Sequence, residues 1–235
     1  MDLRAGIRAG VGAGARMTPA ATIVAHRAGN DLSTLRAAAA HADVLEADVH
    51  LFRGRLEIRH AKTIGPIPVL WERWHLVERT RPPLVLGDLL AAADPGVGLM
   101  LDLKGPDPRL AGAVTRMTLD RPLLVSSRVW WTLERLRGLP GITTLHSVGS
   151  PRQLRTLMRR YGPRELEGVS IHRRLLTPGI VTELRGRAPR VWSWPVNDAA
   201  TATRLAAWGV NGMISDAPTA IRPPGAGAAP APAPQ

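Results

Sequence analysis

The sequence predicts an α/β protein of the (β/α)8 TIM-barrel class, formed by one domain over residues 22–222. Short apolar runs, typical of buried strands, alternate along this range with runs of helical periodicity. Alternation of this kind requires a parallel sheet, and eight such units in this length suit a closed barrel better than an open sheet. An open doubly wound sheet is the alternative architecture.

Most of the expected strands end in a residue that is capable of chemistry. The eight strands are Thr22–His26, Val44–Asp48, Gly98–Lys104, Pro122–Ser126, Ile142–His146, Gly168–His172, Arg190–Trp194 and Gly212–Ser215. The helices expected between them are Ser33–His41, Leu84–Ala93, Pro108–Leu119, Val129–Arg137, Pro151–Tyr161, Pro178–Arg185 and Ala199–Trp208.

Three local features refine this barrel. Ser33 is the expected N-cap of the first helix, and Pro108 opens a later one in its first turn. After the second strand we expect a shortened insertion, made of a short extended segment over Arg55–Arg59 and a long loop over residues 61–83 on the active-site side. The last helix, after Pro218, is short or missing.

Composition limits the classes of site. Hydrophobic residues make up 45% of the chain, which is enough for a substantial core. Because cysteine is absent, disulfides and thiolate metal sites are excluded. The net charge of +12 comes almost wholly from arginine and favours anionic partners such as phosphates, acidic lipid headgroups or nucleic acid.

The two ends of the chain lack the patterns of folded structure. Residues 1–21 have no sustained apolar stretch, so we expect a disordered extension rather than a signal peptide. Residues 223–235 are nearly all Pro, Ala and Gly and are expected to be disordered. No apolar run is long enough to span a bilayer, so the expected location is the cytoplasm.

Two carboxylates on the second strand suggest a cation site. Glu46 and Asp48 are two residues apart, so both side chains point the same way, toward the barrel axis. Negative charge buried there is costly unless a cation binds. Oxygen ligands of this kind favour Mg²⁺ or Ca²⁺. The alternative is that both acids form salt bridges with nearby arginines.

Further polar residues end the neighbouring strands. His26 and Arg27 follow the first strand, and His60 follows the extended segment after the second. Asp102 and Lys104 repeat the two-residue spacing on the third strand, where the acid completes a metal site and the ammonium holds an anionic oxygen. A buried ion pair is the alternative for Asp102 and Lys104.

The ordered set of these residues resembles the glycerophosphodiester phosphodiesterase family over about residues 22–220. The matching pieces are His26-Arg27, Glu46-x-Asp48, His60, Asp102-x-Lys104, Trp194-Pro195-Val196-Asn197 and Gly209-Val210-Asn211-Gly212-Met213-Ile214-Ser215-Asp216-Ala217-Pro218. Each piece is weak alone, but their order is specific to the family.

The resemblance implies a (β/α)8 barrel that hydrolyses glycerophosphodiesters to glycerol 3-phosphate and an alcohol, within lipid and glycerol metabolism. Carried over by motif, the roles concern seven residues. The metal ligands would be Glu46, Asp48 and Asp102, the acid/base pair His26 and His60, and the phosphate-binding cations Arg27 and Lys104. Trp194 and Asn197 are further candidates, as an aromatic wall for the glycerol or alcohol group and an amide near the pocket, with core packing as the alternative for Trp194.

The chain departs from the family pattern at four points. The Glu-Asn-Thr box after the first strand is missing, and Asn30 is its candidate replacement. Ala61 follows the second histidine in place of the usual Asp, and Asp102 replaces the commoner Glu. The insertion that caps the family's pocket is about half its usual length, which predicts an open mouth for a bulky or lipid-linked diester, with Trp71 and Trp74 either on its rim or packed against the outer edge.

Two other functions remain open at this point. The same site on sphingomyelinase D-like relatives transfers a phospholipid phosphate intramolecularly and gives a cyclic product. A catalytically inactive barrel would instead use its arginine-rich surface to bind acidic membrane or nucleic acid, although no specific nucleic-acid motif is visible. His146 and His172 also end strands on the same rim, and we expect neither to take part directly in the chemistry.

Overall fold

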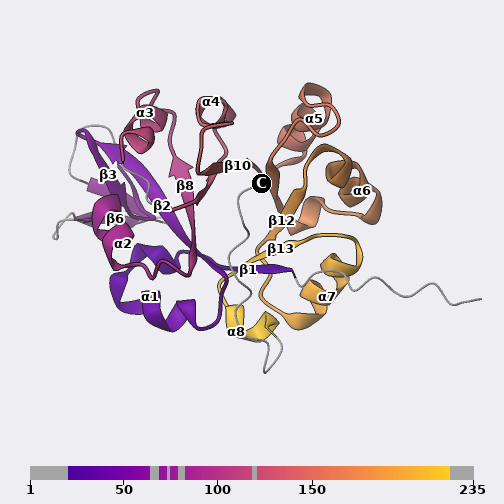
Figure 1. The fold of residues 1–235 in the computed structure, drawn as a ribbon, viewed down its shortest axis with the longest axis horizontal. Coiled ribbons are helices and arrows are strands. Elements are labelled where there is room, and N and C mark those ends of the chain that lie inside the picture. Colours follow the sequence, from indigo (N-terminus) through magenta and orange to yellow (C-terminus); the bar gives the residue numbers. More distant parts are fainter. Residues whose placement is uncertain (1–20, 64–68, 73–74, 79–82, 118–120, 223–235) are drawn as a thin grey trace, which may run out of the picture.

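Eight parallel strands close into a barrel, as the sequence predicts (Figure 1). The computed structural model describes residues 21–63, 69–72, 75–78, 83–117 and 121–222. In order around the barrel, the strands are β1 (Thr22–Ala25), β2 (Val44–Phe52), β8 (Gly98–Lys104), β9 (Leu123–Ser127), β10 (Ile142–Val148), β11 (Gly168–His172), β12 (Arg190–Trp194) and β13 (Gly212–Ser215). Strand β1 closes the ring, because Thr22 lies opposite Gly212 of β13 and Val24 opposite Val44 of β2.

Helices follow the strands and surround the barrel (Figure 1). They are α1 (Leu32–Ala39), α2 (Leu86–Ala92), α3 (Leu110–Thr115), α4 (Trp130–Glu134), α5 (Pro151–Arg160), α6 (Pro178–Arg187), α7 (Ala199–Ala207) and α8 (Pro218–Ile221), with 3₁₀ turns η1 (Ala28–Asn30) and η2 (Arg173–Leu175). Helix α8 has 4 residues, which confirms the short last helix.

Three helix starts differ from expectation. Asp31, and not Ser33, is the N-cap of α1, because its carboxylate accepts a hydrogen bond from the Ser33 amide. Helix α3 begins at Leu110, after Pro108. In the third case, the segment expected to begin a helix at Leu84 first forms strand β7 (Leu84–Val85), which pairs with the insertion, and α2 begins only at Leu86.

The insertion after β2 contains more strand than expected. Strand β3 (Arg55–Ile58) runs antiparallel to β2, in agreement with the extended segment predicted there. The long loop predicted over residues 61–83 is wrong, because β4 (Lys62–Thr63), β5 (Val69–Glu72) and β6 (His75–Glu78) form a three-stranded antiparallel sheet. The Val, Leu and Trp residues of β5 and β6 suit strands, and their pairing satisfies the backbone groups. Trp74 lies outside the described residues, and the side chain of Trp71 is not described.

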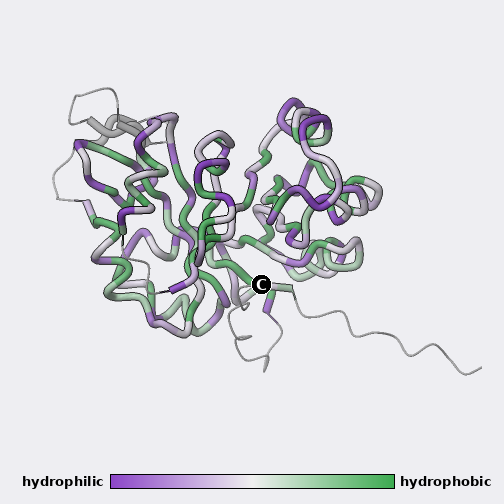
Figure 2. Tube along the Cα trace, turned by 45° about the horizontal axis from the view of Figure 1, so that its top comes forward, coloured by the Kyte–Doolittle hydropathy of each residue, from purple (hydrophilic) through white to green (hydrophobic). Residues whose placement is uncertain are grey.

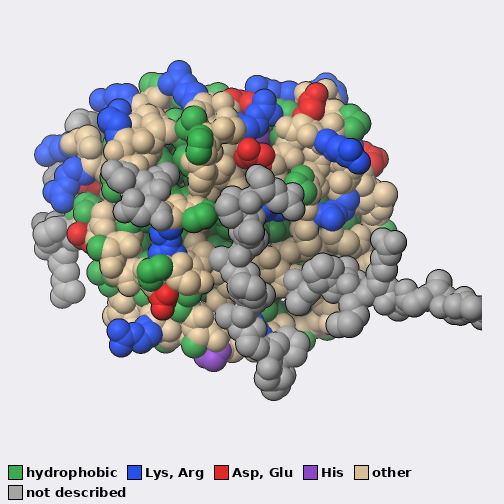
Figure 3. All heavy atoms as spheres, in the orientation of Figure 1, with side chains coloured by type: hydrophobic (Ala, Val, Ile, Leu, Met, Phe, Trp, Pro, Cys, Tyr) green, Lys and Arg blue, Asp and Glu red, His purple; other side chains and the backbone are tan. Residues whose placement is uncertain are grey.

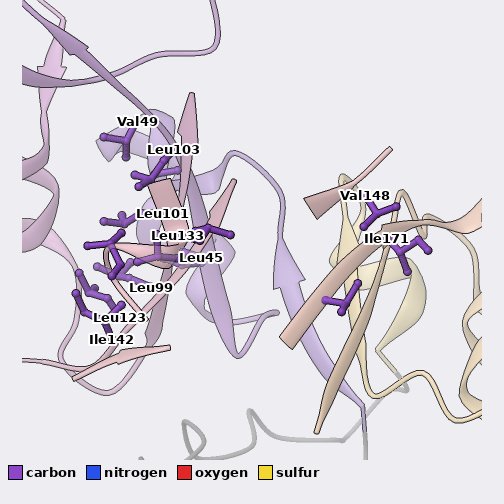
Figure 4. Packing of buried hydrophobic residues seen from close by; sticks show 14 of the residues in the cluster. Leu45, Val49, Leu99, Leu101, Leu103, Leu123, Leu133, Ile142, Val148 and Ile171 are labelled. Carbon is purple, nitrogen blue, oxygen red and sulfur yellow. The ribbon is translucent and has the colours of Figure 1, made fainter. Parts of the chain in front are cut away.

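The core has two layers, because successive residues of a strand point to opposite faces. The larger layer lies between the strands and the helices; Figure 4 shows part of it around Leu45, Leu101 and Leu123. The smaller layer fills the barrel and consists of Val24, Val44, Met100, Leu124, Leu145, Trp192 and Ile214. Hydrophobic segments accordingly follow the strands in Figure 2. Gly212 belongs beside this inner layer, since a side chain there would collide with the ring of Trp192.

His146 points away from the barrel interior, so the rim position expected from the sequence is wrong. Its neighbour Leu145 faces inward, and His146 is therefore directed into the layer under α4 and α5, where it is fully buried. Its Nε2 lies 3.3 Å from the Glu134 carboxylate, which also accepts a 2.5 Å hydrogen bond from the Tyr161 hydroxyl.

This cluster predicts part of the acid sensitivity of the fold. Burial lowers the pKa of His146 below its ordinary 6.5, and the Glu134 hydrogen bond offsets this only in part, with Arg137 and Arg160 also opposing protonation. The unfolded chain takes up this proton first, so stability falls as the pH drops below about 6.5. In thermal unfolding, we expect the Tm of His146→Gln to decrease less than the Tm of the wild type when the pH is lowered from 7.5 to 5.5. Parallel curves for the two proteins would contradict this.

In the described part of the chain, no helix has both the length and the apolar character needed to cross a membrane.

Candidate active site

Three carboxylates meet inside the barrel, two from β2 and one from near the carboxyl end of β8. Oxygen atoms of Glu46, Asp48 and Asp102 all lie within 4.8 Å of one another. Parallel pairing explains this convergence, because Asp48 lies directly opposite Asp102 and Glu46 precedes Asp48 on the same face. Glu46 is 2% exposed and Asp48 0% exposed. The acids therefore meet inside the mouth of the barrel, away from bulk water.

Two cations compensate part of this negative charge. The Lys104 ammonium lies 2.7 Å from one oxygen of Asp48 and also contacts Asp102. Arg27 donates its backbone N–H to Glu46 over 2.6 Å, and its Nε lies 3.6 Å from Asp48. The side chains of Arg27 and Lys104 are 34% and 31% exposed, so both also reach the solvent in the mouth.

The charges shift the pKa values of the acids in opposite directions. Burial, followed by the charges of Asp48 and Asp102, raises the pKa of Glu46 well above its ordinary 4.5. Burial also acts to raise the pKa of Asp48, but the charge and hydrogen bond of Lys104 and the hydrogen bond from Asn30 outweigh it and lower that pKa. The pKa of Lys104 is raised, because the three carboxylates outweigh the effect of its own burial. Repulsion among the three acids therefore affects Glu46 most, because Lys104 contacts Asp48 and Asp102 directly.

Asn30 occupies the place that the sequence leaves open beside the acids. Its side-chain amide donates to Asp48 over 2.9 Å, and its carbonyl oxygen accepts the backbone N–H of Asp48 over the same distance. Because Asn30 lies in η1 directly after Arg27, this pair ties the end of β1 to β2. Ser126 holds Asp102 similarly, donating its hydroxyl over 2.7 Å.

The two histidines lie on either side of Arg27. His26 precedes it in the chain, at the end of β1, and the Arg27 guanidinium donates to Nε2 of His60 over 2.7 Å. Arg27 reaches these partners from a left-handed backbone conformation, with φ of 58°. The structure therefore brings both imidazoles and all three acids to the same end of the barrel.

Asp216, which has no role assigned from the sequence, is the partner of His26. Its carboxylate lies 2.7 Å from Nδ1 of His26, although 190 positions separate the two residues. A carboxylate on Nδ1 places the imidazole proton there and leaves Nε2 directed elsewhere. The signal in the sequence was the position of Asp216 directly after β13, at the same end of the barrel as His26.

Trp194 ends β12, and Asn197 follows it by three residues. The half-buried ring of Trp194 packs against the inner layer of the barrel, at the carboxyl end of β12. The Asn197 side chain accepts the backbone N–H of Asp216 over 3.0 Å and donates to its carboxylate over 3.2 Å. Asn197 therefore holds the partner of His26 in place.

The residues present fit a divalent cation. Three oxygen donors converge, two of them buried, and oxygen is the ligand that hard cations such as Mg²⁺ and Ca²⁺ prefer. Ionising all three acids in this buried place is costly unless such a cation is bound.

Comparison with solved structures identifies the fold. A phosphodiesterase from Oleispira antarctica, solved in complex with the product sn-glycerol-3-phosphate, matches with a TM-score of 0.66 and 21% identity, over 85% of this chain and 94% of that chain. Glycerophosphodiester phosphodiesterases from Thermotoga maritima (TM-score 0.65, 14% identity, 84% and 95% coverage) and Parabacteroides distasonis (0.61, 22%, 84% and 93%) match similarly. The chain has the fold of the glycerophosphodiester phosphodiesterases. The resemblance seen in the sequence is therefore confirmed at the level of the fold.

Comparisons based on the sequence alone gave no match. No protein-family model matches the sequence, and no curated protein matches it. The glycerophosphodiester phosphodiesterase fold is thus recognisable in the ordered motifs and in three dimensions.

Proposed function

We propose that the protein is a metal-dependent glycerophosphodiester phosphodiesterase that releases glycerol 3-phosphate and an alcohol. The observation that carries this proposal is the convergence of Glu46, Asp48 and Asp102 beside two imidazoles, at the carboxyl ends of the strands. Enzymes on (β/α)8 barrels keep their sites at this end. The similar Oleispira phosphodiesterase was solved with sn-glycerol-3-phosphate, which supports a substrate of this chemistry.

The three acids would hold one Mg²⁺ or Ca²⁺. When bound, the cation would supply Lewis-acid stabilisation of the charge that gathers on the phosphoryl oxygens. Arg27 and Lys104 add N–H donors to the same oxygens, since both side chains are about one third exposed to the mouth. They also offset the mutual repulsion of the acids.

His26 and His60 would move the protons. Hydrolysis forms a bond from a water oxygen to phosphorus and breaks the bond from phosphorus to the alcohol oxygen. One imidazole takes the proton from the attacking water, and the other gives a proton to the departing alkoxide. Asp216 keeps the proton of His26 on Nδ1, so that Nε2 faces the reaction. Trp194 and Asn197 would border the organic part of the substrate.

The proposal is tested by turnover of glycerophosphocholine, glycerophosphoethanolamine and lysophospholipids, with Mg²⁺ or Ca²⁺ against EDTA. Phosphorus NMR identifies the products. We expect free glycerol 3-phosphate from the small diesters and acylated glycerol 3-phosphate from the lysophospholipids, and only when a cation is present. A cyclic phosphate product would show that the reaction is intramolecular transfer and not hydrolysis. Equal rates in EDTA, or no turnover of any diester with either cation, would refute the proposal.

A preference between small and lipid-linked diesters follows from the same assay. The open mouth predicted from the sequence requires turnover of lysophospholipids. Rapid turnover of small diesters with refusal of every lysophospholipid would reject that part of the proposal.

A further inference from the structure

One wall of the catalytic mouth is built from cationic side chains around Trp194. The Arg128 guanidinium carbon lies 5.0 Å from the centroid of the Trp194 ring, which is the geometry of a cation–π contact. The His172 ring meets Trp194 edge-on, with centroids 4.8 Å apart and an interplanar angle of 87°. Arg128 follows β9, His172 ends β11 and Trp194 ends β12, so all three belong to the catalytic end of the barrel.

The position of Arg128 is set by its surroundings. A Cβ atom at Gly149 would lie 3.2 Å from the Arg128 guanidinium carbon, so the absence of a side chain there gives the guanidinium its place against Trp194. Arg128 is exposed, and within the described ranges it forms no ion pair with a carboxylate. Its charge is therefore directed at the mouth without compensation from a described acid.

Two more arginines add to this wall. Arg173 and Arg174 follow β11 in the turn η2, and only Arg173 lies near a described acid, with 4.0 Å to the Asp198 carboxylate. Burial lowers the pKa of His172, and the charges of Arg174, Arg173 and Arg128 lower it further. Three guanidinium groups thus oppose protonation of the His172 imidazole, which itself packs against Trp194.

The cationic wall is connected to the reacting groups through one short path. Trp194 is followed by Asn197, which is hydrogen-bonded to Asp216, and Asp216 contacts His26. The acids of β2 and β8 lie across the mouth from His172 and Trp194, because β11 and β12 are the strands opposite β2 and β8 in the barrel order, and Arg128 reaches Trp194 from the end of β9, the neighbour of β8. A diester whose phosphate lies at the acids therefore extends one of its organic groups toward Arg128 and Trp194.

We infer that Arg128, Arg173 and Arg174 select glycerophosphodiesters whose alcohol group carries negative charge and disfavour those with a cationic alcohol such as choline. This inference rests on the proposed function, because it names the substrate class of the same site. Like charges repel the choline ammonium, and the Trp194 face on which a quaternary ammonium would stack is already covered by Arg128. An additional phosphate on the alcohol instead gains charge-assisted hydrogen bonds from guanidinium groups.

The test compares three diesters that differ in the charge of the alcohol: glycerophosphocholine, glycerophosphoinositol and glycerophosphoinositol 4-phosphate. We expect kcat/KM to rise in that order for the wild type, and the order to weaken as salt is added. Arg128→Gln should lower the ratio of the anionic to the cationic substrate by about three- to five-fold, mainly through KM, as expected for an exposed ion pair. Arg128→Lys should retain most of the ratio.

Arg155→Gln is the matched control, because Arg155 is an exposed arginine on the outer helix α5. The ratio should be unchanged in this variant. An unchanged ratio in Arg128→Gln, or a wild-type preference for the choline diester, would overturn the inference while leaving the proposed hydrolysis intact.

Binding measurements separate this inference from the proposed function. Calorimetric titration of the wild-type protein with the same three diesters in EDTA reports their order of affinity without turnover. If no diester is hydrolysed, the proposed function fails, but stronger binding of the anionic diester than of the choline diester still supports the cationic wall. Equal or reversed affinities would contradict it.

Discussion

Replacing His26 by alanine is expected to lower the turnover of glycerophosphodiesters by about 10²–10⁴-fold, the usual contribution of a general acid or base. The reason is geometric, because His26 is held by Asp216 over 2.7 Å beside the carboxylate cluster. Folding should be nearly unaffected, since the His26 side chain is 28% exposed and is not part of the apolar core. Activity and thermal unfolding are measured on the same preparation.

Two further variants give this experiment its control. His41→Ala removes an exposed histidine that lies before β2, at the other end of the barrel, and should leave turnover unchanged. Asp216→Asn removes the carboxylate that orients His26 and should cost part of the activity, with a changed pH profile of kcat. Wild-type rates in both His26→Ala and His60→Ala would show that the assigned acid/base chemistry is wrong.

Replacing Glu46 by glutamine is expected to abolish cation-dependent activity while making the metal-free fold more stable. A buried carboxylate with a raised pKa destabilises the fold as the pH rises above the ordinary 4.5, because the unfolded chain gives up that proton more readily. The amide of glutamine removes this cost, and its oxygen still accepts the backbone N–H of Arg27. The gain in Tm in EDTA should therefore be larger at pH 8 than at pH 5.

The activity of the same variant should fall by more than about 100-fold, the upper loss seen when only an outer partner of a metal ligand is changed. Turnover with Mg²⁺ or Ca²⁺ and thermal unfolding in EDTA are the two measurements. A variant that is less stable than the wild type in EDTA at both pH values would refute the account of repulsion among the acids.

The barrel was predictable because its signals are local and repeated. Each strand is a short apolar run, and helix caps such as Ser150, Thr177 and Asp198 directly precede their helices. The insertion was less predictable, because β4, β5 and β6 are stabilised by pairing with each other and their short sequences show no period-two pattern. Pairing partners are a tertiary property.

The site was predictable where strand geometry alone places residues. Period-two spacing puts Glu46 and Asp48 on one face, and parallel pairing brings Asp102 opposite Asp48. Two other features could not be predicted in this way. The hydrogen bond between Asp216 and His26 joins residues 190 positions apart. The direction of the His146 side chain depends on which residues of β10 face the barrel interior.

The charge on the molecular surface says less about substrate choice than the residues of the site do. Lys and Arg side chains are spread over the face seen in Figure 3 and form no single stripe there. A dispersed charge of this kind is consistent with general attraction of anions to the protein. Selection among anions therefore depends on the few arginines at the mouth, above all Arg128.

The central claim is that Glu46, Asp48 and Asp102 together bind one divalent cation. Calorimetric titration of the metal-free protein with Mg²⁺ or Ca²⁺, run in parallel on wild type and Glu46→Gln, measures this directly. The account predicts one bound cation per chain in the wild type and a loss of that binding in the variant. Equal binding by both proteins, or no binding by the wild type, would contradict it.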